Sequence, residues 1–289
     1  MATTKPSHSE QVLYRDATTL TIPADGVQVA YRDLGPRRGV PLIFFTHVSG
    51  NLDNWDPRIV DGIAANRRVI TFDYRGVGAS SGKVRPTIEL MAGDAADFIS
   101  ALGLDQVDVL GFSLGGMVAQ ALVQSKPQLI RRLILAGTSP AGSPALGKLT
   151  RRSDINLARA VVTLRDPKEL LFFPRTSEGK AAAKDFLRRL KERTTGRDKT
   201  ISFPGYRTQL KAIQRWGQDA DQELGTIQLP VLVVNGDNDQ GVPTSDTIDL
   251  ARRLPNSQLV LYPGSGHGAI FQYHREFVET VLAFLTGNG

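Results

Sequence analysis

The chain has 289 residues, 41% of them hydrophobic, which is enough for one large core or one core that carries a substantial insertion. Its formal net charge is +6, and it contains no cysteine, which excludes disulfides, thiolate zinc sites and a cysteine nucleophile. No apolar run reaches the roughly 18 residues of a membrane span, and the polar start lacks the apolar part of a secretory signal. We therefore expect a cytoplasmic protein without a membrane span.

Short apolar runs alternate with helical patterns, which is typical of a mostly parallel sheet covered by helices. The predicted strands are Val29–Arg32, Leu42–Thr46, Arg68–Phe72, Val107–Leu110, Leu133–Ala136, Val231–Asn235 and Leu259–Tyr262. Helical patterns lie near Ile88–Leu102, Leu114–Ser125, Ser245–Leu254 and Phe277–Leu285. This order predicts an α/β fold.

The alternation stops at about Gly137 and resumes at about Thr226. The segment between these points has no convincing buried strand, and its helical stretches are interrupted by Pro144, Pro167, Pro174 and Pro204. We interpret it as a helical insertion. The predicted core domain therefore comprises residues 1–139 and 226–289, and the insertion comprises residues 140–225.

Residues 148–215 hold 18 Lys and Arg against 7 Asp and Glu, a local net charge of +11, and the rest of the chain is slightly acidic. A basic segment can bind nucleic acid, an anionic lipid surface or an acidic substrate. Helical patterns such as Lys180–Arg193, which carries its own apolar stripe, favour ordinary solvated helix faces instead. No aromatic residues are interleaved among the bases, so we expect no nucleic-acid partner.

The segment Gly111-Phe-Ser-Leu-Gly-Gly116 directly follows one predicted strand and directly precedes a predicted helix. A nucleophile on so tight a turn is strained, and glycines two before and two after Ser113 relieve the crowding. The amides and the dipole of the following helix point at a developing oxyanion. Gly-x-Ser-x-Gly alone is a weak pattern, and the strand–turn–helix context is what makes Ser113 the candidate nucleophile.

A serine hydroxyl needs a general base, and the chain has four histidines. His8 lies in the polar N-terminal segment, His274 suits a helix start, and His47 ends a predicted strand. His267 lies between glycines in the loop after the last predicted strand, where it has no core to fill. We therefore predict His267 as the base.

The carboxylate that orients the base is expected between the serine and the histidine in the chain. The buried-strand run Val231–Asn235 leads into a loop with two acids, Asp237 and Asp239. Spacing does not separate them, and both are also typical of an ordinary Gly/Asn/Asp turn. The loop after Leu133–Ala136 has no acid near its tip, which removes that location.

Two other kinds of site are disfavoured. Asp73-Tyr-Arg-Gly-Val-Gly78 has two glycines of a dinucleotide-binding loop, but Ser81 stands where the third glycine is needed. We interpret this segment as a loop-shaping element. No Asp, Glu or His cluster has metal-ligand spacing, so we predict neither a metal nor another cofactor.

Together these motifs resemble the α/β-hydrolase superfamily, and within it the bacterial esterase, haloperoxidase-like and carbon–carbon hydrolase branch. The matching segments are His47-Val-Ser-Gly-Asn51, Asp73-Tyr-Arg-Gly-Val-Gly-Ala-Ser80, Gly111-Phe-Ser-Leu-Gly-Gly116, Gly236-Asp-Asn-Asp-Gln-Gly-Val-Pro243 and Gly266-His-Gly268. The resemblance covers residues from about 25 to 286. It implies a mostly parallel, eight-stranded sheet with helices on both faces, and it identifies the 140–225 insertion as a helical cap over the active site.

The resemblance also implies roles for particular residues. In this family the acid ends a Gly-x-x-Asp pattern that is followed by Val-Pro or Thr-Pro, which selects Asp239. The backbone N–H groups of Leu114 and Ser49 are the expected oxyanion-hole donors. The family usually has His-Gly where this chain has His47-Val48, and backbone amides do not depend on side-chain identity, so the hole survives if the loop geometry does.

Three residues of that loop, Val48, Asn51 and Trp55, are expected to border the substrate pocket. Residues of the insertion either line the pocket or form the insertion's own core, namely Leu170, Phe172, Phe173, Phe203, Tyr206 and Trp216.

A serine at position 113 distinguishes the chain from the dehalogenases and epoxide hydrolases that resemble it and carry an aspartate there. We expect hydrolysis of a small-molecule carboxylic ester, or of a related acyl or carbon–carbon bond, through an acyl-enzyme. Perhydrolase or haloperoxidase-like activity requires the same triad, and a small-molecule sensor that keeps the triad is an alternative of another class. The sequence leaves both a monomer and a homodimer open.

Overall fold

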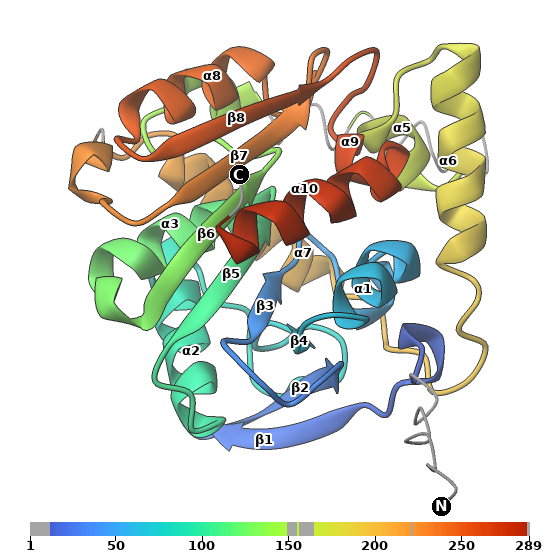
Figure 1. The fold of residues 1–289 in the computed structure, drawn as a ribbon, viewed down its shortest axis with the longest axis vertical. Coiled ribbons are helices and arrows are strands. Elements are labelled where there is room, and N and C mark those ends of the chain that lie inside the picture. The colour runs from blue at the N-terminus through green and yellow to red at the C-terminus, as the bar shows by residue number, and fades with distance from the viewer. Residues whose placement is uncertain (1–11, 149–154, 156–164, 221, 288–289) are drawn as a thin grey trace, which may run out of the picture.

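The protein is described by a computed structural model that covers residues 12–148, 155, 165–220 and 222–287. Its centre is one eight-stranded sheet in the order β1-β2-β4-β3-β5-β6-β7-β8 (Figure 1). The β1–β2 and β2–β4 pairs are antiparallel and the other pairs are parallel. The strands are β1 (Leu20–Ala24), β2 (Val27–Leu34), β3 (Leu42–Phe45), β4 (Val69–Phe72), β5 (Val107–Phe112), β6 (Ile130–Ala136), β7 (Val231–Gly236) and β8 (Ser257–Tyr262). The predicted fold class is confirmed.

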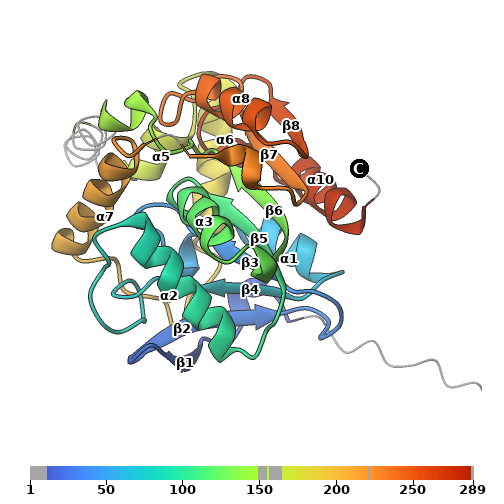
Figure 2. The same ribbon diagram turned by 90° about the vertical axis from the view of Figure 1, so that its left-hand side faces the viewer.

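Helices pack on both faces of the sheet (Figure 2). One face carries α2 (Ile88–Ala101), α3 (Leu114–Ser125) and α8 (Thr244–Arg253), and the other carries α1 (Pro57–Ala64) and α10 (His274–Thr286). Each central strand contributes to both hydrophobic clusters because successive side chains point to opposite faces.

The alternation is clear in β3 and β5. Phe45 and Val109 belong to the cluster beneath α2 and α3, whereas Phe44 and Leu110 belong to the cluster beneath α1 and α10. All seven predicted strands are present, with ends that shift by a few residues, and β1 is an additional strand that the sequence pattern did not indicate.

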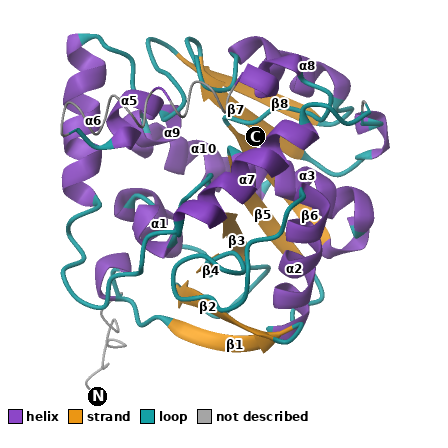
Figure 3. Cartoon of the chain, turned by 180° about the vertical axis from the view of Figure 1, so that it is seen from behind, coloured by secondary structure: helices purple, strands orange, loops and turns teal. Residues whose placement is uncertain are grey.

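Between β6 and β7 the described residues form helices and no strand (Figure 3). They are η4 (Pro144–Lys148), α5 (Pro167–Phe172), α6 (Ser177–Arg189), α7 (Phe203–Trp216) and η5 (Leu224–Thr226). Pro167 and Pro204 lie in the first turns of α5 and α7, where a proline has no N–H bond to lose, so they begin helices and do not interrupt them. We call residues 140–225 the cap segment, and these boundaries stay a prediction.

None of the helices in the described part of the chain combines the length and the apolarity that a bilayer crossing requires.

A buried ion pair attaches the cap segment to the core. Arg189, at the end of α6, places Nε 3.0 Å from both carboxylate oxygens of Asp56 and donates through Nη2 to Phe271 O. Asp56 also caps α1 by accepting from the Arg58 amide. The Asp56 side chain is fully buried and that of Arg189 is 7% exposed. The pair therefore joins α6, α1 and α9 (Ala269–Gln272) at one point.

Arg189→Met should lower the free energy of unfolding by about 3–5 kcal/mol, because it leaves the Asp56 carboxylate buried without its counter-ion. The matched control is Arg188→Met, since the Arg188 side chain is 69% exposed and pairs with Asp185 on its own helix. The control should leave stability unchanged within error. Urea denaturation of both variants measures the difference, and equal midpoints would contradict the anchoring role.

Candidate active site

Ser113 lies in a strained turn between the end of β5 and the start of α3. Its φ of +58° is in the region that side chains other than glycine rarely adopt. The surrounding backbone leaves no room for larger residues: a Cβ on Gly111 would lie 2.5 Å from the Gly115 carbonyl oxygen, and one on Gly115 would lie 1.9 Å from Phe45 O. The two glycines therefore permit the close approach of α3 to β3 and β5 at this turn, where Ser113 is buried.

A chain of hydrogen bonds starts from this hydroxyl. Ser113 Oγ lies 3.0 Å from His267 Nε2, and His267 Nδ1 lies 2.7 Å from Asp239 Oδ2. The other carboxylate oxygen, Oδ1, accepts from the amides of Gly241 and Val242 at 2.7 and 3.0 Å. Because Nδ1–H donates to the carboxylate, Nε2 is the acceptor that faces the serine.

The topology brings these three residues together. β7 and β8 are parallel neighbours, so the loops after them meet at the same edge of the sheet, next to the turn after β5. Gly236, at the end of β7, allows this contact, since a Cβ there would lie 2.3 Å from Ser265 O. Of the two acids that spacing left open, Asp239 is buried beside His267, whereas Asp237 is exposed and accepts at 3.4 Å from the Ser265 amide.

Phe172, the last residue of α5, holds the loop that carries His267. Its carbonyl oxygen accepts from the Gly268 amide at 2.7 Å. Its ring lies 5.7 Å from the His267 imidazole and 5.1 Å from that of His47, and the Phe112 ring lies 5.1 Å from His267 on another side. Sequence reasoning included Phe172 only in a set of cap aromatics, because no spacing connects it with the histidine loop.

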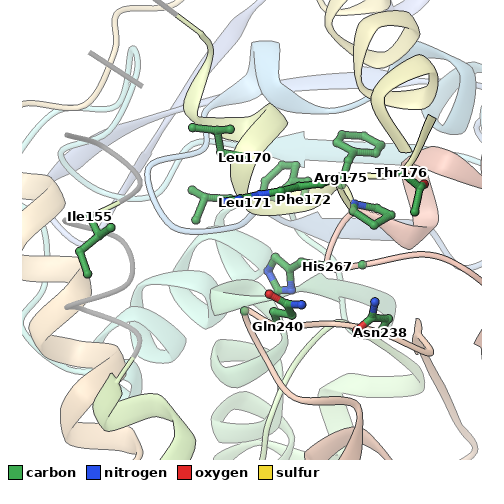
Figure 4. A pocket seen from close by; sticks show the side chains of 13 residues that line it. Ile155, Leu170, Leu171, Phe172, Arg175, Thr176, Asn238, Gln240 and His267 are labelled. Carbon is green, nitrogen blue, oxygen red and sulfur yellow. The ribbon is translucent and has the colours of Figure 1, made fainter. Parts of the chain in front are cut away.

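A cavity of about 640 Å³ reaches His267 from the cap side (Figure 4). In the close-up the apolar side chains of α5 lie across from Asn238 and Gln240, with His267 between them. Its lining residues are Ile155, Leu170, Leu171, Phe172, Phe173, Pro174, Arg175, Thr176, Asn238, Gln240, Gly241, Gly266 and His267. The cavity thus has an apolar wall and a polar wall, and the His267 imidazole lies between them.

The cap residues singled out from the sequence divide into two groups. Leu170, Phe172 and Phe173 line the cavity. The other three do not line it: Trp216 is buried in the cluster beneath α2 and α3, Tyr206 is half-buried on α7, and Phe203 is 67% exposed at the start of α7. The sequence could not separate these groups, because both contain large apolar side chains on helices.

The loop residues Val48, Asn51 and Trp55 are not among those that line this cavity, and neither is Ser113, so their place at the substrate pocket stays a prediction. The Asn51 side chain accepts from the amide two residues later and donates to Lys199 O. The buried Trp55 ring packs edge-on against Phe44, 4.8 Å between centroids. Val48 is half-buried against the core. Local capping and core packing therefore occupy these side chains.

The two predicted oxyanion donors differ in the hydrogen-bond acceptors of their backbone amides. Leu114 is the first residue of α3, so its amide has no intrahelical acceptor. The Ser49 amide donates to Gln209 Oε1 at 2.7 Å, across 160 positions of sequence. Ser49 also has a positive φ of +63°, in the region that residues other than glycine rarely adopt. Sequence reasoning missed Gln209 altogether.

His47 is held as a neutral, structural side chain. Burial lowers the pKa of His47 to about 3, and its Nδ1 lies 2.8 Å from Val48 O. It is therefore uncharged near neutral pH, and its hydrogen bond runs to the backbone and not to Ser113. This arrangement agrees with a role in shaping the loop after β3.

Within the described residues, one group of acids is close enough together to share a cation, namely Asp25, Asp94 and Asp97. Two of them already pair with arginines: Arg75 and Arg85 both lie within 3.1 Å of Asp25 and Asp94 carboxylate oxygens. None of these acids is a candidate active-site residue.

Comparison with known proteins finds a matching family, related sequences and similar structures. The family described as alpha/beta hydrolase fold matches residues 40–272. A putative carbamate hydrolase, RutD, of Rhizobium rhizogenes is 28% identical over 84% of this chain and 92% of its own length. The putative non-heme bromoperoxidase BpoC of Mycobacterium tuberculosis is 29% identical over 89% of this chain and 96% of its own. The structure of an alpha/beta hydrolase fold protein from Chitinophaga pinensis superimposes with a TM-score of 0.90 and 39% identity, covering 95% of this chain and 99% of that one.

Proposed function

Because this chain belongs to the alpha/beta hydrolase fold family, we propose that it is a serine hydrolase that cleaves a small-molecule carboxylic ester or a related acyl bond. The observation that carries the proposal is the hydrogen-bonded series from Ser113 Oγ through His267 to Asp239. Hydrolases among its relatives support the reaction class. Ester cleavage, the catalytic roles of these residues and the cap boundaries are our proposals.

The first half-reaction forms an acyl-enzyme. His267 Nε2 removes the proton from Ser113 Oγ as the oxygen attacks the substrate carbonyl carbon, and Asp239 stabilises the imidazolium that results. The tetrahedral oxyanion is bound by the backbone amide of Leu114, and by that of Ser49 once it is free of Gln209. His267 then gives its proton to the leaving alcohol as the carbon–oxygen bond breaks.

The second half-reaction releases the acid. Water enters where the alcohol left, His267 removes one of its protons, and the resulting hydroxide oxygen attacks the acyl carbon. Collapse of the second tetrahedral intermediate breaks the bond to Ser113 Oγ, which recovers its proton from His267. The charge on Asp239 does not change in either step.

The cavity supports a small substrate with an apolar part. Its volume of about 640 Å³ is in the range of small-molecule sites. Leu170, Leu171 and Phe172 offer an apolar wall to an acyl or aromatic group, and Asn238 and Gln240 offer hydrogen bonds on the other side. A carbamate, which the name of one relative suggests, is also an acyl compound.

The proposal is tested by labelling the protein with a fluorophosphonate and mapping the modified peptide. We expect one label, on Ser113, and loss of activity in proportion to labelling. In parallel, p-nitrophenyl esters from acetyl to octanoyl and a p-nitrophenyl carbamate would define the acyl group. Labelling that persists in Ser113→Ala would overturn the assignment of the nucleophile.

The same assay separates an enzyme from a triad-bearing sensor. An enzyme releases many equivalents of p-nitrophenol per protein, whereas a sensor stops after a stoichiometric burst. A burst without turnover would overturn the hydrolase proposal even if Ser113 carries the label.

A further inference from the structure

Gln209 is a buried glutamine of α7 with one strong contact. Its Oε1 accepts from the Ser49 amide at 2.7 Å, and its side chain is fully buried. Its Nε2 has no hydrogen-bond partner among the described residues. The carboxamide is attached through its oxygen only, so turning it away breaks a single hydrogen bond.

In this contact the side-chain carbonyl oxygen of Gln209 accepts from the Ser49 amide. The proposed mechanism needs the same amide for the substrate oxyanion. Ser49 is held at a φ of +63°, and the Gly50 amide donates to His47 O, so the turn fixes the direction of the Ser49 N–H. The carboxamide oxygen of Gln209 therefore occupies the position at this donor that the substrate oxyanion would take. One N–H cannot serve both oxygens at full strength.

The contact also connects the cap segment to the loop after β3. α7 lies against the core, with Leu210, Ile213 and Trp216 buried, and Gln209 projects from the same helix toward Ser49. The position of α7 thus determines whether the Ser49 amide is occupied. No comparable side chain contacts the Leu114 amide in the hydrogen bonds of the described residues.

We propose that Gln209 is a positioning residue that stands in for the substrate carbonyl at the Ser49 amide and must give up this amide before the oxyanion hole is complete. The proposal rests on the proposed serine hydrolase function. In this role Gln209 competes with the oxyanion of the transition state for the Ser49 amide. A scaffold residue would instead support the transition state.

The test compares Gln209→Leu, which has similar volume and no acceptor, with Gln209→Glu, whose carboxylate is a stronger acceptor. Binding of an alkyl boronic acid, which adds to Ser113 and presents a tetrahedral oxygen, measures the oxyanion hole directly. Gln209→Leu should bind the boronate roughly threefold to tenfold more tightly, the value of one net hydrogen bond, and raise kcat/KM by a similar factor. Gln214→Leu, the same change on the same helix, is the control and should match the wild type.

Gln209→Glu should lower kcat/KM at least tenfold, since an anion at the Ser49 amide both competes with and repels the oxyanion. The ratio of variant to wild-type activity should rise as the pH falls, because burial raises the pKa of the introduced carboxyl and its protonation removes the charge. A merely structural residue would not produce this pH-dependent ratio. If Gln209→Leu does not fold, Gln209→Asn, which is too short to reach Ser49, should show the same tighter boronate binding.

If the wild type is active, two results would overturn the inference alone: boronate binding by Gln209→Leu that is no tighter than that of the wild type, or equal activities of the Leu and Glu variants. A wild-type protein that neither hydrolyses esters nor binds the boronate would instead overturn the proposed function, and the inference with it.

Discussion

Replacement of Ser113 by alanine is expected to lower kcat for ester hydrolysis by about 10⁴- to 10⁶-fold. Without Oγ no acyl-enzyme forms, and water must attack the bound ester directly. The residual rate comes from substrate binding and from the oxyanion donors, which are backbone groups that the substitution leaves in place.

The Ser113→Ala protein should fold normally, because alanine at this position removes one hydrogen bond to His267 and leaves the same backbone conformation. Ser100→Ala, an exposed serine of α2, is the matched control and should retain full activity. Steady-state kinetics and a thermal melt of both proteins make the comparison. More than about 1% of wild-type kcat in Ser113→Ala would contradict nucleophilic catalysis at this residue.

Asp239→Asn is expected to lower kcat by about 10³- to 10⁴-fold. The carboxylate holds His267 with Nδ1 protonated, and its other oxygen is fixed by two backbone amides. An asparagine in this place presents either a donor that favours the wrong imidazole tautomer or a neutral acceptor that does not stabilise the imidazolium.

The chain supplies its own control, because Asp237 is two residues away in the same loop and is exposed. Asp237→Asn should change kcat by less than about threefold, since surface substitutions of this kind have small effects. Measured with the same ester, the two variants decide between the acids that sequence spacing left open. A larger loss in Asp237→Asn would show that the wrong acid was assigned.

The fold was largely predictable because its strands are buried and therefore apolar. β5 and β7 are read directly from Val107–Phe112 and Val231–Gly236, in which every residue is buried. β1 was missed because it is an edge strand with largely exposed residues and a proline at position 23, so it exists only by pairing with β2. The short helix α1 was also missed, although Asp56 caps it and Pro57 is its first residue, which are local start signals.

The candidate site was predictable where function imposes a local pattern. Glycines must stand within two residues of Ser113 and His267, so a short window of sequence shows them. The expectation that Trp55 and Asn51 border the substrate pocket stays a prediction; their side chains also serve packing and capping, which depend on Phe44 and Lys199. No pattern in the sequence near Trp55 indicates that its ring packs against Phe44 of β3.

By itself the sequence determined the α/β class, the order of the central strands along the chain and the serine–histidine pair. These features depend on the alternation of side chains in strands and on small residues at tight turns, which involve neighbours in sequence. Spacing left Asp237 and Asp239 open and the family resemblance selected Asp239, but only the tertiary structure decided that Phe172 holds the histidine loop and that Gln209 occupies the Ser49 amide. Those contacts join residues far apart in the chain, and they depend on how the cap segment packs on the core, which no local pattern specifies.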